Sequence, residues 1–340
     1  MRNIIAGCIV PALLVLGGCR KADVNGPDLR TPGSGTYIVN EGGFGGGGNL
    51  SFYDPSTGAV SNDVIRNAEN WLFPNDILFF SGKMYVAING SDRVSVIDPE
   101  TDSVRITIEF PPGTGPGFLV AGDNRIYSSN YNGTVTAIDP VGDTLLGSSA
   151  RVVGFPGDIL VTEGKIFVSD LGAWPDTGTS MKVLDQGTLT VLDSVSPGGG
   201  PAQMTLAGGK LYLGTAVAKK IWRIDPVTLA IEDSSDLGSV PGDLATDGIH
   251  LYVLTQDAVE RIPINVFERD SVPLIRRTDG LFHYALGYDE AAGELYISNI
   301  TTAGGSGEIG VYTRTGVPVR PPFPGGIFPG AFGFYRAGLP

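Results

Sequence analysis

The chain contains a stretch that reads Pro74-Asn75-Asp76-Ile77, then Gly82-Lys83-Met84-Tyr85-Val86, then Val94-Ser95-Val96-Ile97-Asp98-Pro99. A Pro opens an apolar run, an aromatic residue lies in the run that follows, and an Asp-Pro pair closes the unit. Val, Ile and Tyr favour strands, whereas Gly and Asp-Pro favour tight turns. The stretch therefore predicts antiparallel strands joined by short turns, with an inner strand over Ile77–Phe80 and a second strand over Lys83–Ile88.

The same unit recurs with a period just above forty residues. Its aromatic anchor is spaced by 42, 40, 45, 40 and 44 residues, at Tyr85, Tyr127, Phe167, Tyr212, Tyr252 and Tyr296. A repeat of this length with four short strands is typical of a β-propeller blade. A further copy begins at Tyr37 without its Pro-initiated strand, and that strand appears at Phe328–Tyr335. We therefore predict an all-β, seven-bladed propeller of four-stranded blades over residues 35–340, closed by pairing of its N- and C-terminal strands.

The first nineteen residues have the pattern of an export signal. A short basic start precedes an apolar stretch from Ile4 to Leu16, which is too short for a membrane-spanning helix. Small residues then lead to Cys19, as in a bacterial lipoprotein signal. We predict a signal peptide over 1–18, lipid attachment at Cys19 and a flexible tether over 19–34. An ordinary signal cleaved nearby is the alternative.

Composition limits the partners of the exported domain. The formal net charge of −13 would repel the phosphates of nucleic acids and the surface of an anionic bilayer. We therefore expect no nucleic-acid partner, and contact with the membrane through the lipid anchor only. Both cysteines lie within the first nineteen residues, so the domain is expected to fold without disulfides. The predicted location is an exported protein anchored to the outer membrane, facing either the periplasm or the cell surface.

The repeated phrases resemble those of the YncE-like seven-bladed propellers. The opening Tyr37-Ile38-Val39-Asn40-Glu41-Gly42-Gly43-Phe44-Gly45 resembles the start of a lipoprotein branch of that group. Members of this branch in Bacteroidota lie on the cell surface, and some capture cobalamin for a TonB-dependent outer-membrane transporter. The resemblance implies a small-molecule ligand, with cobalamin as the named candidate, and a TonB-dependent transporter as the partner.

Ligands of propellers usually bind over the central axis, on the face formed by the loops after each second strand and before each inner strand. Polar residues that end the second strands are Asn40, Asn89, Asn130, Asp170 and Asn299, with Glu41 next in the chain. Polar residues at the entries of the inner strands are Asp76, Asp158, Gln203 and Asp243, and His283 takes the place of an opening Pro. Aromatic residues in the same loops are Phe44, Trp71, Phe73, Tyr131 and Trp174.

Each candidate also has a structural interpretation. Asn and Asp often end strands because they satisfy backbone groups or turn the chain. Trp71 and Phe73 could equally fill the gap between two blades. The aspartates of the repeated Asp-Pro pairs are interpreted as turn residues, because Asp bonds its own backbone and Pro presets φ.

Catalysis has little support in the sequence. No Ser-His-Asp arrangement, Cys nucleophile, zinc spacing or phosphate loop is evident. We therefore predict no catalytic residue, no metal site and no cofactor. Ca2+ would nevertheless suit oxygen ligands such as Asp76, Asp158 and Asp243. Two alternative functions stay open: a metal-dependent lactonase or lyase, and a scaffold that binds only protein.

Overall fold

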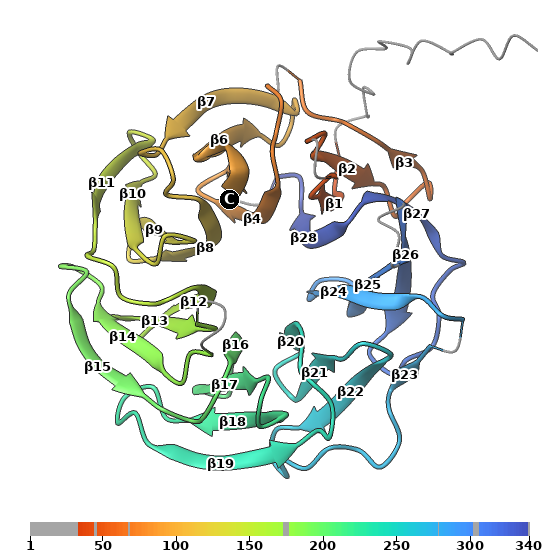
Figure 1. Cartoon of the computed structure of the whole chain (residues 1–340). Helices are drawn as coiled ribbons and strands as arrows, with labels where there is room; N and C mark the ends of the chain where they lie inside the picture. Colours follow the sequence, from red (N-terminus) through yellow and green to blue (C-terminus); the bar gives the residue numbers. More distant parts are fainter. Residues whose placement is uncertain are drawn as a thin grey trace, which may run out of the picture.

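The structure, a computed structural model, describes residues 33–43, 46–66, 69–172, 177–277, 279–301 and 306–338. Within them the strands form seven four-stranded antiparallel sheets, arranged as a ring around a central axis (Figure 1). Each sheet is one blade, so the predicted seven-bladed propeller is confirmed. In the described part of the chain, no helix is long and apolar enough to cross a membrane.

Two strands of each blade lie closest to the axis. The inner strands are β4 (Pro74–Phe80), β8 (Pro116–Gly122), β12 (Pro156–Thr162), β16 (Pro201–Ala207), β20 (Leu244–Thr246), β24 (Phe282–Asp289) and β28 (Pro329–Tyr335). The second strands are β1 (Gly35–Asn40), β5 (Lys83–Ile88), β9 (Arg125–Asn130), β13 (Lys165–Asp170), β17 (Lys210–Thr215), β21 (His250–Leu254) and β25 (Glu294–Ile300).

The other two strands complete each blade towards the rim. The third strands are β2 (Asn49–Tyr53), β6 (Arg93–Asp98), β10 (Val135–Asp139), β14 (Met181–Asp185), β18 (Lys220–Ile224), β22 (Ala258–Pro263) and β26 (Ser306–Thr313). The outer strands are β3 (Val60–Ser61), β7 (Ser103–Glu109), β11 (Thr144–Ser148), β15 (Val191–Val195), β19 (Ile231–Asp236), β23 (Ile275–Arg276) and β27 (Phe323–Ile327). A short 3-10 turn, η1 (Asn89–Ser91), follows β5.

The ring closes as predicted, because the last strand completes the first blade. Strand β28 pairs with β1, with Gly35 opposite Tyr335 and Val39 opposite Ala331. Beyond β28, Arg336 forms an ion pair with Asp289 of the seventh blade. Closure pairs a strand edge that would otherwise be open to other chains.

The aromatic anchors form the core between blades. All seven, from Tyr37 to Tyr296, are fully or almost fully buried. Buried side chains form seven clusters, each between two adjacent blades. The Tyr37 hydroxyl crosses from the first blade to donate to the Pro99 carbonyl at 3.0 Å and to Asp102. Both faces of each second strand are therefore buried, which explains their near-continuous apolar sequences.

The recurring Asp-Pro pairs are turn residues, as predicted. Asp54 accepts the backbone N–H of Ser56 at 2.8 Å, and Asp98 accepts that of Glu100 at 2.9 Å. Asp139 and Asp225 make the same type of bond two residues ahead. We call the face that carries these turns the turn face, and the opposite face, with the loops after the second strands and before the inner strands, the loop face. Strand β1 begins at the turn face and ends at the loop face.

Candidate functional site

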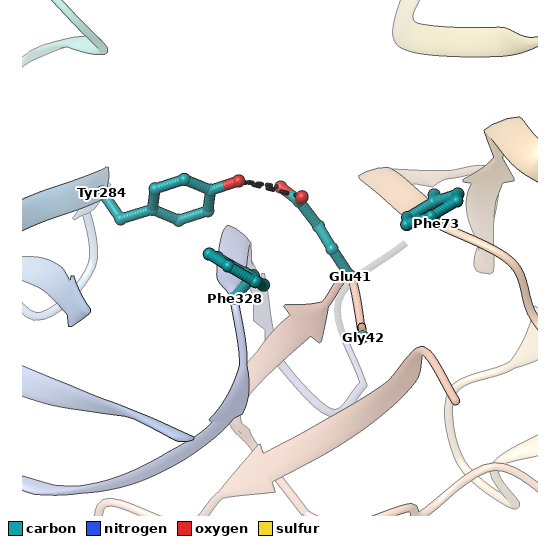
Figure 2. A pocket seen from close by; sticks show the side chains of 5 residues that line it. All are labelled: Glu41, Gly42, Phe73, Tyr284 and Phe328. Carbon is teal, nitrogen blue, oxygen red and sulfur yellow. Dashed lines mark hydrogen bonds between the residues drawn. The ribbon is translucent and has the colours of Figure 1, made fainter. Parts of the chain in front are cut away.

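A cavity opens on the loop face beside the seam between the first and last blades. It has a volume of about 200 Å3 and is lined by Glu41, Gly42, Phe73, Tyr284 and Phe328 (Figure 2). Glu41 and Gly42 follow β1, Phe73 and Phe328 precede β4 and β28, and Tyr284 lies in β24. The cavity is therefore on the face where the sequence predicted a ligand. Glu41 and Phe73 were predicted, whereas Tyr284 and Phe328 were not.

The polar centre of the cavity is a contact between Glu41 and Tyr284. The Tyr284 hydroxyl lies 2.8 Å from Oε1 and 2.9 Å from Oε2 of Glu41, and Figure 2 shows the carboxylate pointing toward it. Burial raises the pKa of Glu41, the Tyr284 hydrogen bond lowers it, and the charge of Asp243 raises it, with a net increase. Burial and the Glu41 charge raise the pKa of Tyr284, so the phenol stays protonated and donates.

The loop that carries Glu41 is held against the last blade by its backbone. The N–H of Glu41 donates to the Phe328 carbonyl at 2.9 Å, and the N–H of Gly42 donates to the Ile327 carbonyl at 3.1 Å. Gly330, in β28, leaves the space that the carboxylate occupies, because a Cβ there would lie 2.2 Å from Oε1 of Glu41. The position of Glu41 is therefore set by two blades at once.

Both phenylalanines of the cavity have a left-handed backbone. The φ angle is +51° at Phe73 and +50° at Phe328, and each residue precedes the Pro that opens an inner strand. Gly115 and Gly200 have the same position and also a positive φ. Gly adopts this conformation with little strain, whereas a bulky residue there is unusual and strained. Such strain clusters at ligand-binding sites, so the two aromatic residues are candidates for contact with a ligand.

Three aspartates lie nearer the axis, at equivalent positions of alternate blades. Asp76 accepts the N–H of Leu119 at 2.7 Å, and Asp158 accepts that of Met204 at 2.8 Å. Asp243 makes the same bond to the N–H of Leu286 at 2.9 Å. Each bond joins the entry of one inner strand to the inner strand of the next blade. These carboxylates therefore connect neighbouring blades around the axis.

The three aspartates hold protons more tightly than ordinary carboxyl groups. Burial raises the pKa of Asp76 to about 7, of Asp158 to about 8 and of Asp243 to about 6, against the opposing effect of backbone N–H donors. Repulsion among them adds to the increase for Asp76 and Asp158. Within the described residues, no Lys or Arg forms an ion pair with these aspartates or with Glu41. Among the described residues, the carboxyl groups near the axis on the loop face thus have no ion-pair partner.

Tyr131 occupies, in the third blade, the position that Glu41 has in the first. Its hydroxyl donates to Oδ1 of Asn75 at 2.7 Å, and its ring stacks on Phe155 with 4.6 Å between centroids. Burial and the charges of Glu41 and Asp76 raise the pKa of Tyr131 to about 12. Tyr131 therefore belongs to the same electrostatic environment as the cavity.

Several predicted strand-end residues form hydrogen bonds within the protein through their polar side chains. The Asn40 amide donates to Asn49 and Ser51, both at 2.8 Å, and the Asn130 amide donates to two threonines. Asp170 accepts the N–H groups of Gly154, Phe155 and Gly172. The contact from the Asn89 amide to the Gly115 carbonyl is longer, at 3.4 Å. These bonds agree with the structural interpretation of the strand ends, and we leave the four residues out of the proposed site.

The remaining predicted residues have different surroundings. His283 and Asn299 are buried and joined by a 2.7 Å contact between Nδ1 and Oδ1, and burial lowers the pKa of the histidine. Trp71 is 2% exposed and packs in the cluster between the first and second blades, as its structural alternative predicted. Gln203 is half-buried at the entry of β16. Three predicted residues lie outside the described residues: Cys19, Phe44 and Trp174.

A metal centre finds little support in the described part of the chain. No group of three or more His, Cys, Asp or Glu residues there is arranged to hold a metal ion. Asp76 and Asp158 each use both carboxylate oxygens on backbone N–H groups. Each of these oxygens therefore already accepts one backbone hydrogen bond, which leaves fewer lone pairs for a calcium ion.

Comparison with known proteins places the sequence in a family. The family model described as Domain of unknown function (DUF5074) matches residues 34–249, which is more than half of the chain. The chain belongs to the DUF5074 family. The matched DUF5074 region begins just before β1 and includes Glu41, Phe73 and the three axial aspartates. A search of curated proteins finds no match.

Solved structures share the propeller fold of this DUF5074 protein. A quinonprotein alcohol dehydrogenase-like protein from Bacteroides thetaiotaomicron has a TM-score of 0.72 and 15% identity, over 89% of this chain and 78% of that chain. A functionally unknown protein from Desulfotomaculum acetoxidans has a TM-score of 0.72 and 14% identity, over 89% and 99%. A candidate 6-phosphogluconolactonase from Bacteroides fragilis has a TM-score of 0.69 and 14% identity, over 91% and 99%. At these identities the similarity concerns the fold alone.

Proposed function

We propose that this protein is an exported, lipid-anchored propeller that binds a small nutrient on its loop face and delivers it to a TonB-dependent outer-membrane transporter. The observation that carries the proposal is the cavity formed by Glu41, Phe73, Tyr284 and Phe328. It combines apolar walls with one buried polar pair, which is the usual composition of a small-molecule site. Two of its lining residues, Phe73 and Phe328, have a strained backbone conformation.

The size of the cavity limits what enters it. At about 200 Å3 it is smaller than the roughly 300–1,000 Å3 typical of pockets that enclose drug-sized ligands. It therefore suits a small nutrient, or one projecting group of a larger ligand that rests on the loop face. Cobalamin is a candidate of the second kind, and its support is the sequence resemblance to surface propellers.

The path of the chain relates the loop face to the proposed anchor. Strand β1 begins at Gly35 on the turn face, opposite the cavity. If lipid is attached at Cys19, the loop face points away from the anchoring point. The segment 20–34 would span at most about 50 Å if fully extended. A tether of this length would let the loop face turn toward a transporter in the same membrane.

Calorimetric titration tests the binding proposal directly. Wild-type protein and the Glu41→Gln variant would be titrated with cobalamin and cobinamide, with Glu163→Gln as the control because Glu163 lies exposed on the turn face. We expect Glu41→Gln, and not Glu163→Gln, to weaken binding about tenfold or more. No heat and no spectral shift at micromolar protein would remove cobalamin as the ligand. Co-purification with an outer-membrane barrel tests whether a transporter is the partner. A complex that small molecules do not affect would instead favour a scaffold that binds only protein.

A hydrolase or lyase is the second candidate function. Its support is the set of three axial carboxyl groups whose pKa values lie near neutrality, since such groups can act as general acids or bases. This function predicts turnover of lactone-type substrates that is lost with EDTA and with Asp158→Ala. An unchanged rate after both treatments would exclude it.

A further inference from the structure

We propose that the group entering the cavity is an organic ammonium ion, held by the Glu41 carboxylate and by the aromatic rings of Phe73, Tyr284 and Phe328. This inference rests on the proposed function and narrows it to a class of ligand. It follows from three independent properties of the cavity: its charge, its walls and the free acceptor capacity of its carboxylate.

Charge is the first property. Glu41 is partly buried; burial raises its pKa, and the charge of Asp243 adds to that increase. In the residues that the structure describes, Lys and Arg side chains make no ion pair with either carboxylate. A buried carboxylate without a counter-charge is unfavourable, and a cation that enters the cavity relieves that cost. An anionic ligand would be repelled, and a neutral one would leave the charge uncompensated.

Aromatic walls are the second property. The rings of Tyr284 and Phe328 lie 5.7 Å apart at an interplanar angle of 51°, and Phe73 lies on the other side of Glu41 (Figure 2). Aromatic faces attract cations, and cages of such rings recognise methylated ammonium groups. The two phenylalanine side chains offer no hydrogen bond, so they favour an apolar or a weakly hydrated cationic group. Their strained φ angles show that the fold keeps aromatic residues where Gly would be less strained.

The third property is the hydrogen-bonding capacity that Glu41 retains. A carboxylate has about four lone-pair sites, and the Tyr284 hydroxyl brings one hydrogen that the two oxygens share. Several acceptor sites therefore remain for an ammonium donor. Gly330 leaves the space that the carboxylate occupies, and it has no side chain that could hydrogen-bond to the carboxylate.

Titration with a cation and its neutral isostere tests the inference. Choline and ethanolamine are the cationic probes, and 3,3-dimethylbutan-1-ol has the shape of choline without the charge. We expect both cations to bind wild-type protein at least tenfold more tightly than the alcohol. Affinity for choline should rise with pH through a midpoint above the ordinary glutamate range, because Glu41 must ionise and its pKa is raised. Affinity for the alcohol should not change with pH.

Variants assign the effect to the cavity. Glu41→Gln should reduce choline affinity about tenfold or more and remove its pH dependence, whereas Glu163→Gln should change neither. Phe73→Leu keeps an apolar side chain but removes the aromatic face, and should weaken choline about three- to tenfold. Circular dichroism would establish that each variant is folded.

The outcomes separate this inference from the proposed function. Equal binding of choline and the alcohol, or no binding of either cation, overturns the ammonium assignment. If cobalamin or another ligand still binds and Glu41→Gln still weakens it, the binding function stands without this ligand class. If wild-type protein binds neither the cations nor any other small molecule, both proposals fail.

Discussion

The Tyr284 hydroxyl contacts both carboxylate oxygens of Glu41, at 2.8 and 2.9 Å, across the seam between the last and first blades. The two residues are 243 positions apart in the sequence. Ring closure by β28 and β1 brings them together, because Glu41 follows β1 and Tyr284 lies in the inner strand of the neighbouring blade. The pairing of β1 with β28 that closes the ring therefore also brings together the two residues at the polar centre of the candidate site.

Tyr284→Phe is expected to shift the pH dependence of ligand binding upward. The hydroxyl lowers the Glu41 pKa, so its removal lets burial raise that pKa further. At a pH close to the Glu41 pKa a smaller fraction of Glu41 would be ionised, and choline affinity there should fall. Tyr288→Phe is the matched control, since Tyr288 lies in the same strand toward the turn face. Identical pH profiles for Tyr284→Phe and wild type would contradict the role of this hydrogen bond.

The stability of the propeller should fall as pH rises toward 8. Asp158 has a pKa of about 8 in the folded protein, well above the value of about 4 expected in an unfolded chain. The folded state therefore binds the proton more tightly, so this contribution is complete below pH 4 and lost as pH rises through 8.

Asp158→Asn should reduce the loss of unfolding free energy between pH 5 and pH 8.5 by about 1–2 kcal/mol, because solvent screens this partly exposed carboxyl group. Urea unfolding at pH 5 and pH 8.5 measures the change. Asp185→Asn is the control, because Asp185 is only partly buried and its lowered pKa affects stability only in acid. A wild-type stability that does not decline over this range would show that Asp158 is ionised without penalty.

Arg336→Ala is expected to weaken ring closure. Arg336 binds both oxygens of Asp289, whose side chain is 5% exposed, so its loss leaves a buried carboxylate with the Ala292 N–H but without a counter-charge. We expect a loss of about 1–3 kcal/mol in the free energy of unfolding. Arg105→Ala removes an exposed ion pair to Asp98 within one blade and should cost less than about 1 kcal/mol. Similar losses for the two variants would mean that the Arg336 pair has no special role in closure.

Lipid attachment at Cys19 predicts how the protein partitions. Wild-type protein from a bacterial host that processes lipoproteins should enter the detergent phase and carry lipid on the peptide that begins at residue 19. Cys19→Ser should leave the protein in the aqueous phase, with the propeller still folded. Mass spectrometry of the N-terminal peptide decides the matter, and an unmodified Cys19 would exclude the anchor.

The sequence predicted the scaffold closely, since each blade repeats the same local signals. The predicted second strand Lys83–Ile88 has the observed bounds of β5. The inner strand of that blade begins earlier than predicted, at Pro74 rather than Ile77, because a bulge after the Pro keeps the entry within the sheet. Asp-Pro turns and closure by the C-terminal strand also followed from the repeat alone.

The site was less predictable, since it depends on departures from the repeat. Tyr284 was not predicted, because His283 replaces the opening Pro of that blade and was the candidate chosen at that strand entry. Phe328 was interpreted only as the start of the closing strand. A usable signal was present: Gly115 and Gly200 precede other opening prolines, where Phe73 and Phe328 carry aromatic side chains. Asn40 and Asn130 form hydrogen bonds within the protein, as buried strand ends require, and a ligand role for them stays a prediction.

Competitive native mass spectrometry of wild type against Gly330→Ala tests whether the cavity on the loop face binds a ligand. The added Cβ would meet the Glu41 carboxylate and displace it, although every lining residue keeps its identity. Both proteins, which differ by one methylene group in mass, would share one sample with choline, ethanolamine, cobalamin and cobinamide. We expect a ligand adduct on wild type that is at least tenfold weaker on Gly330→Ala. Equal adducts on the two proteins, or none on wild type, would contradict this expectation.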